Sequence, residues 1–263
     1  MSGHSLGADV SAIRQFRGAA RAASLATVVL AQVAPAYADE ACRFVTVGSA
    51  TVRAATMDGI ALEDGRVVRL AGIELSAAPE LAIGTAVMLK RLGAETDRYG
   101  RLQAHVFLTD NGTERWVQAD LLARGIARMS SRVGDPACAK LLLGHENSAR
   151  AARLGLWAEP VYVIGKAEEP AGVLESRGRF GLVEGKVVSV RESGGTIYVN
   201  FGRRWSEDFT VTIAKRNERA FAAAGLVPKS LNGRRVRIRG WIEERGGPWV
   251  EAARPEQIEV LNN

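Results

Sequence analysis

Short runs of apolar and β-branched residues, separated by turn signals, recur along most of this chain and limit the folds it can adopt. Asp64-Gly65 and Asp97-Arg98-Tyr99-Gly100-Arg101 separate such runs in the first half of the chain, as hairpin connections do. After these runs, apolar residues recur at the spacing of a helix. Strands therefore precede helices, as in an α+β, mainly β unit. The expected strands lie at 43–47, 60–62, 67–73, 85–90 and 102–108, and the expected helices at 116–128 and 140–154.

A second β-rich unit follows a seam at residues 159–177, where Pro160, Pro170 and several charges interrupt the pattern. Three strands, a helix and two strands then follow in the order of an OB-type barrel. We therefore expect domains at 39–158 and 178–263, joined by a linker at 159–177. The expected strands are 185–190, 196–201, 208–213, 234–242 and 249–252, and the expected helix spans 216–224.

Residues 1–38 have the pattern of a signal peptide. Three arginines precede an apolar run at 24–31, and Ala36-Tyr37-Ala38 supplies an A-x-A cleavage site. The run is too short to span a bilayer as a helix. We expect cleavage after Ala38, export to the periplasm or beyond the cell, and no transmembrane span in the mature form. The alternative is an uncleaved N-terminal anchor.

Charge and composition exclude some functions. Among 263 residues, 35 are basic and 29 acidic, and without residues 1–38 the net charge falls from +6 to +4. A basic chain is compatible with an anionic partner. Three histidines and two cysteines are too few for a zinc cluster. In an exported chain, Cys42 and Cys138 predict one disulfide that joins the first strand to a late helix, and two separate buried thiols are the alternative.

Four stretches of residues 43–157 resemble the staphylococcal-nuclease (thermonuclease) family. The D-x-Y-G-R motif at 97–101 is the most specific of them, and the second unit is similar to an OB-like extension on some exported members. The resemblance implies an OB-fold barrel with packed helices, followed by a second OB-like barrel. The four stretches are VVRLAGIE at 67–74, DRYGR at 97–101, VQADLLARGIA at 117–127 and ENSARAARLGLW at 146–157.

The resemblance also implies a chemistry: calcium held by carboxylates, a glutamate base and two arginines on the scissile phosphate. Arginine suits that phosphate because its planar fork donates two hydrogen bonds and stays charged. Arg69 and Arg101 match the two family arginines, and Glu80 could supply the base after a small insertion. Asp97 and Tyr99, from the D-x-Y-G-R motif, are expected to help bind substrate.

The calcium ligands match less completely. Glu74 stands where the family has a calcium-binding aspartate, and Asp58 falls on the other metal-binding aspartate. A gapped alignment would instead leave that second ligand missing. Only Leu81 to Gly84 remain for the helix that the family places beside its site. Each candidate also has a structural alternative, such as a turn carboxylate or a surface ion pair.

The second unit contains a basic strand. Alternation puts Arg235, Arg237 and Arg239 on one face, where they could bind nucleic acid beside Tyr198, Trp241 or Trp249. The alternative is a solvated strand face with the aromatic residues in the core. Two functions follow from these patterns: a calcium-dependent phosphodiesterase acting on DNA or RNA, or a non-catalytic exported module that binds nucleic acid or protein.

Overall fold

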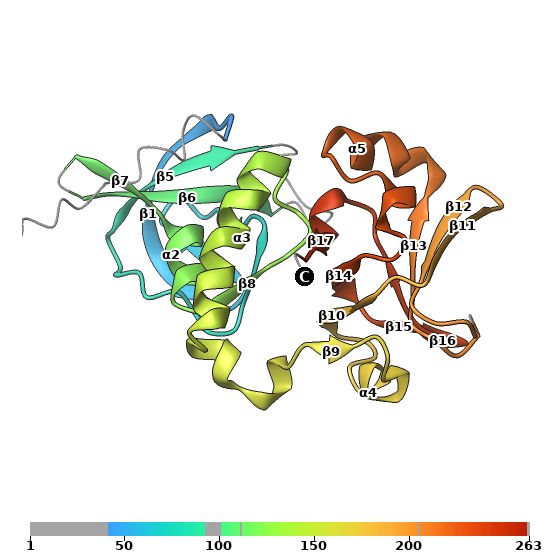
Figure 1. Ribbon diagram of the computed structural model, residues 1–263. Helices are drawn as coiled ribbons and strands as arrows, with labels where there is room; N and C mark the ends of the chain where they lie inside the picture. The colour runs from blue at the N-terminus through green and yellow to red at the C-terminus, as the bar shows by residue number, and fades with distance from the viewer. Residues whose placement is uncertain (1–41, 93–100, 111, 205, 262–263) are drawn as a thin grey trace, which may run out of the picture. The chain divides into compact units, whose positions relative to one another are not determined.

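A computed structural model describes residues 42–92, 101–110, 112–204 and 206–261. These residues belong to one compact unit, in which two clusters of buried apolar side chains form separate cores (Figure 1). The expected signal peptide at 1–38, and also Asp97 and Tyr99, lie outside the described residues. No helix among the described residues is long and apolar enough to cross a membrane.

The first core fills a closed five-stranded barrel. Strand β1 pairs antiparallel with β2 and β5, β2 pairs with β3, and β5 pairs with β6. A parallel pairing between β3 and β6 closes the ring. This strand order confirms the expected OB barrel. The strands are β1 Val45–Thr56, β2 Gly59–Leu62, β3 Val67–Leu70, β5 Ala86–Arg91 and β6 Leu102–Asp110, and β7 Thr113–Trp116 extends the sheet beyond β6.

Along β3, side chains alternate between the core and the outside of the barrel. In β3, Val68 and Leu70 are buried in the core, whereas Arg69 points outward. Gly59 opens β2 at a φ of +136°, and a Cβ there would lie 2.2 Å from the carbonyl oxygen of Val68. Glycine is therefore required where β2 approaches β3.

Two helices and a small sheet cover the barrel. Helices α2 (Val117–Ala123) and α3 (Pro136–Ala151) pack on each other, and β4 (Ile73–Leu75) pairs with β8 (Ala127–Met129). Asp135 caps α3 by accepting hydrogen bonds from the backbone amides of Ala137 and Cys138, at 2.8 and 3.0 Å. Helix α2 is shorter than expected because Gly125, at a φ of +68°, turns the chain into β8. Residues 76–85 contain no helix.

One disulfide ties the first turn of α3 to the chain just before β1. Cys42 and Cys138 are both fully buried, and their Cα atoms are 5.1 Å apart. The expected pairing is confirmed. The bond spans 96 positions of sequence, so it removes much of the conformational freedom of the unfolded chain.

Loss of this bond should destabilise the protein by about 4–5 kcal/mol, as expected for a loop of this length. We expect reductant to shift the urea unfolding curve of the wild type to lower denaturant. The double variant Cys42→Ala/Cys138→Ala provides the control, since it should start from the shifted position and ignore reductant. Equal stability of the oxidised wild type and the double variant would contradict the prediction.

The second core lies between two small sheets. One has the order β17-β14-β10-β9, and the other the order β11-β12-β13-β16-β15, with β13 and β16 parallel. The OB-type closure expected for this unit stays a prediction. The strands are β9 Gly165–Lys166, β10 Phe180–Lys186, β11 Ser189–Ser193, β12 Thr196–Asn200, β13 Thr210–Ala214, β14 Arg235–Trp241, β15 Glu243–Arg245, β16 Gly247–Glu251 and β17 Ile258–Val260, and the helices are α4 Pro170–Leu174 and α5 Glu218–Ala223.

The second core begins inside the segment expected to be a linker. Strand β9 pairs parallel with β10, and Ala167 and Val173 are buried among the apolar side chains of this core. Only the first part of 159–177, which contains a 3-10 turn at Pro160–Tyr162, runs between the two cores and contributes no side chain to either cluster. The prolines that suggested a linker instead start short helical turns.

Candidate functional site

Parallel pairing of β3 with β6 brings the two predicted phosphate-binding arginines together. Arg69 is the register partner of Gln103, and Arg101 lies two residues before Gln103. Since side chains two apart on an extended chain share a face, Arg69, Arg101 and Gln103 project to the same side of the barrel. All three line one cavity of about 620 Å³. The structure therefore places both arginines at the same cavity.

The β4–β8 sheet supplies another wall of this cavity. The Ser130 amide donates a hydrogen bond to the Gly72 carbonyl at 2.8 Å, which holds residues 130–132 beside the end of β3. Gly72 has a φ of +79°, and a Cβ there would lie 2.9 Å from a methyl carbon of Val133. Ser130, Ser131 and Arg132 line the cavity from this side. The sequence patterns did not identify them, since they fall in a loop without a motif.

Glu74 also lines the cavity, but its carboxylate is already paired. It lies opposite Arg128 in the β4–β8 ladder and accepts from the Arg128 guanidinium at 3.0 and 3.1 Å. That guanidinium in turn lies over the rings of Tyr162 and Phe180, at 5.2 and 4.8 Å from their centroids. Glu74 therefore serves as the partner of a largely buried arginine.

The other predicted acidic residues lie elsewhere. Asp58 is in the exposed turn between β1 and β2, where its amide donates to the Thr56 hydroxyl at 3.2 Å. Glu80 lies in the connection 76–85, and its largely exposed carboxylate pairs with Arg124 at 2.7 Å. Neither residue lines the cavity that holds Arg69 and Arg101.

These carboxylates do not fit the expected calcium site. A calcium ion takes six to eight oxygen ligands, and its affinity rises with the number of carboxylates. Within the described ranges, no three acidic, histidine or cysteine side chains are grouped so that they could hold a metal ion. Glu74 is held by Arg128, and Asp58 lies outside the cavity.

The predicted basic surface of β14 is also corrected. Arg235 is exposed, but Arg237 is engaged by Glu184 at 2.5 Å and Glu259 at 3.2 Å. Arg239 is fully buried. The three arginines alternate along the strand as expected, but the strand face that they share is buried at Arg239 and partly buried at Arg237. A groove for nucleic acid cannot include Arg239.

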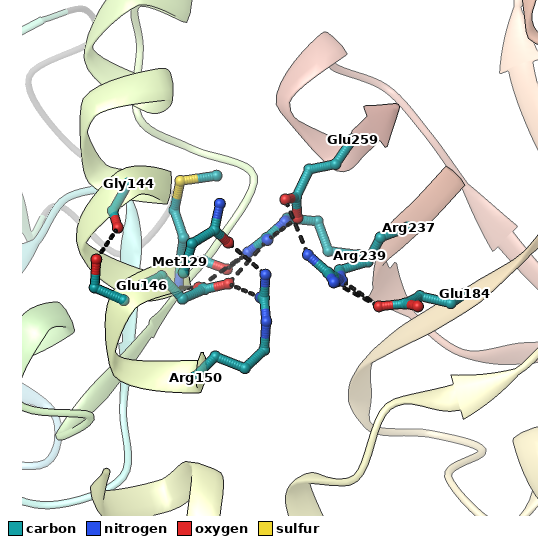
Figure 2. Close-up of polar contacts among 10 residues, drawn as sticks. Met129, Gly144, Glu146, Arg150, Glu184, Arg237, Arg239 and Glu259 are labelled. Atoms are coloured by element: carbon teal, nitrogen blue, oxygen red, sulfur yellow. Dashed lines mark hydrogen bonds and ion pairs between the residues drawn. The ribbon is translucent and has the colours of Figure 1, made fainter. Parts of the chain in front are cut away.

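Arg239 instead forms the centre of a buried ion-pair network between the two cores (Figure 2). Its guanidinium donates to both carboxylate oxygens of Glu146 in α3, at 3.0 and 3.2 Å, and to the Met129 carbonyl at 2.9 Å. It also contacts Glu259 of β17. Glu146 is fully buried too, and accepts from the Met129 amide and from Arg150.

The network keeps the Glu146 carboxylate and the Arg239 guanidinium charged. Burial by itself raises the pKa of Glu146, but the charge and hydrogen bonds of Arg239, with the Met129 amide and Arg150, lower it by more. Burial likewise opposes the charge on Arg239, but Glu146 and Glu259 outweigh it and raise the pKa of the guanidinium. The two cores are therefore joined through compensated charges.

Two aromatic residues from the second β-rich unit complete the cavity. Phe180 of β10 and Trp241 of β14 are register partners, and both line the same hollow as Arg69 and Arg101. Trp241 was one of three aromatics expected to offer a stacking surface. Trp249, by contrast, is buried, with the Arg245 guanidinium 3.4 Å from its ring centroid. The described residues thus define an OB barrel with a cavity that is basic on one side and aromatic on the other.

Comparison with known families assigns part of this barrel. Residues 77–159 match the family model described as staphylococcal nuclease homologue, so this segment is staphylococcal-nuclease-like, as the motifs indicated. It includes Arg101, α2 and α3, but starts after Arg69 and Glu74. The second unit, expected to be an OB-like extension, lies outside the match. No curated protein matches the chain significantly.

Replacing Arg239 by methionine should destabilise the protein by about 3–5 kcal/mol, because Glu146 is then left buried without its main partner. Removing both charges in Arg239→Met/Glu146→Leu should cost much less. Denaturant unfolding measures both variants. Lys166→Ala is the control, because it breaks an exposed pair with Glu169 and should change stability by less than about 1 kcal/mol. Similar values for Arg239→Met and Lys166→Ala would contradict this account.

The same network predicts a pH dependence. A carboxyl group whose pKa is lowered by folding stabilises the protein above its unfolded pKa, about 4.3 for glutamate, and loses that effect as the pH falls through the folded value. The free energy of unfolding of the wild type, taken relative to that of Arg239→Met/Glu146→Leu, should therefore decrease as the pH is lowered below about 4.3.

Proposed function

We propose that this protein binds the phosphodiester backbone of nucleic acid in the cavity lined by Arg69 and Arg101. The observation that carries the proposal is that guanidinium groups from β3 and from the start of β6 line one hollow. A phosphate group accepts several hydrogen bonds from arginine at once. Arg132 adds a third positive side chain to the lining, and Glu74, the one carboxylate among the described lining residues, is paired with Arg128.

The match to the staphylococcal nuclease family favours a second candidate, calcium-assisted hydrolysis of DNA or RNA. Arg69 and Arg101 would then hold the scissile phosphate, with Glu80 as the general base proposed from the resemblance. Against it, Glu80 pairs with Arg124 and lies outside the cavity. The described carboxylates also form no calcium site. We therefore place binding first and hydrolysis second.

Binding is tested with fluorescently labelled single-stranded DNA, with chelator present so that the DNA stays intact. We expect Arg69→Ala and Arg101→Ala each to weaken binding roughly tenfold or more, since hydrogen bonds to charged groups contribute about 1.5–3 kcal/mol. Each should also lower the salt dependence by about one phosphate contact. Arg191→Ala removes an exposed charge on β11 and should have little effect. Equal losses in all three variants would refute a localised site.

Adding millimolar calcium in place of chelator separates the two candidates. Calcium-dependent cleavage that disappears in Arg69→Ala and Arg101→Ala would establish the hydrolase. Intact DNA that stays bound supports the binding protein.

We also propose that the mature protein is exported, with cleavage after Ala38. The buried disulfide supports an oxidising compartment. When the full chain is expressed in a bacterium, N-terminal sequencing of the periplasmic or secreted fraction should begin at Asp39. Recovery of an intact N-terminus in the membrane fraction would instead support the uncleaved anchor.

A further inference from the structure

Trp241 is an exposed aromatic side chain at the edge of a basic cavity. It ends β14, 58% of its surface is exposed, and it lines the hollow that also holds Arg69 and Arg101. Covering this ring with a ligand would bury apolar surface and so favour binding. The position of the ring beside phosphate-binding side chains indicates what kind of ligand would cover it.

The buried network fixes where Trp241 points. Arg239 and Trp241 are two residues apart on β14, so their side chains leave the same face of the strand. Arg239 is bound to Glu146 and to the Met129 carbonyl, in α3 and β8 of the first barrel (Figure 2). The same strand face therefore directs Trp241 toward the cavity at β3 and β4.

Phe180 supports the indole from the neighbouring strand. It is the register partner of Trp241, is buried, and is covered by the Arg128 guanidinium, which Glu74 holds. This wall is thus built from packed residues of both cores. Trp241 and Phe180 also line an adjoining cavity of about 680 Å³, so a chain lying on the indole has room on either side.

We propose that Trp241 stacks on a nucleobase whose phosphate is held by Arg69 and Arg101, and that it thereby selects single-stranded nucleic acid. This inference rests on the proposed function. Aromatic side chains beside a basic groove stack on bases of any sequence, because every base has a flat π face. In a duplex those faces are already stacked on neighbouring pairs, so the indole gains no partner.

The test compares three ligands of equal length in chelator: single-stranded dT, a single strand of abasic sugar phosphate, and a duplex. Fluorescence anisotropy with the purified protein gives each affinity. We expect the wild type to bind the dT strand about 5- to 150-fold more tightly than the abasic strand, the range measured for stacking on one aromatic side chain. Trp241→Ala should remove this preference by lowering the affinity for the dT strand to that for the abasic strand. Trp241→Phe, which keeps an aromatic ring, should recover most of it.

The controls separate the two proposals. Arg69→Ala should weaken dT and abasic binding alike, because both ligands carry the phosphates. Tyr198→Ala removes a partly exposed aromatic ring on β12 that lines a different cavity, and it should leave the preference intact. A preference for dT that survives in Trp241→Ala, or that is lost in Tyr198→Ala, would overturn the inference but not the proposed function. Failure of the wild type to bind any of the three ligands would overturn the proposed function itself.

Discussion

The buried contact of Arg239 with Glu146 is the interaction on which the arrangement of this protein depends. Both side chains are withdrawn completely from water, and each would cost several kcal/mol to bury alone. They are tolerated together because the two carboxylate oxygens and the guanidinium meet in a paired geometry, and because Met129, Arg150 and Glu259 add further hydrogen bonds. Such a pair is poor evidence for net stability. It strongly penalises any other alignment of the strand against the helix, because each alternative would leave a charge unpaired.

That alignment has a functional consequence. With Arg239 held against α3 and β8, the same face of β14 carries Trp241 to the cavity where β3 and β6 place Arg69 and Arg101. The barrel supplies positive charge from one parallel strand pair, and the second unit supplies an exposed aromatic ring from one antiparallel pair. The site that we propose for nucleic acid is thus a product of the way in which the cores are joined.

Much of the first barrel could be predicted from local patterns. The apolar run at 67–73 predicted a strand that carries Arg69, and the D-x-Y-G-R motif placed Arg101 in the connection directly before another strand. The pairing of Cys42 with Cys138 was also expected. The acidic part of the site was less predictable. Glu74 and Glu80 occupy positions that the family resemblance assigns to calcium and catalysis, but their partners, Arg128 and Arg124, lie about 50 residues away in the chain and have no motif.

The sequence by itself indicated several short strands of the first barrel, its disulfide and its likeness to the nuclease family, because these follow from apolar runs between turns, an even cysteine count in an exported chain and short motifs. Only the tertiary structure decided which charges remain available. An arginine on a polar strand face has the same pattern whether that face meets water or another core, so Arg235, Arg237 and Arg239 looked equivalent. Burial against Glu146 separates Arg239 from the others, and a contact 93 positions away in sequence leaves no trace in local spacing.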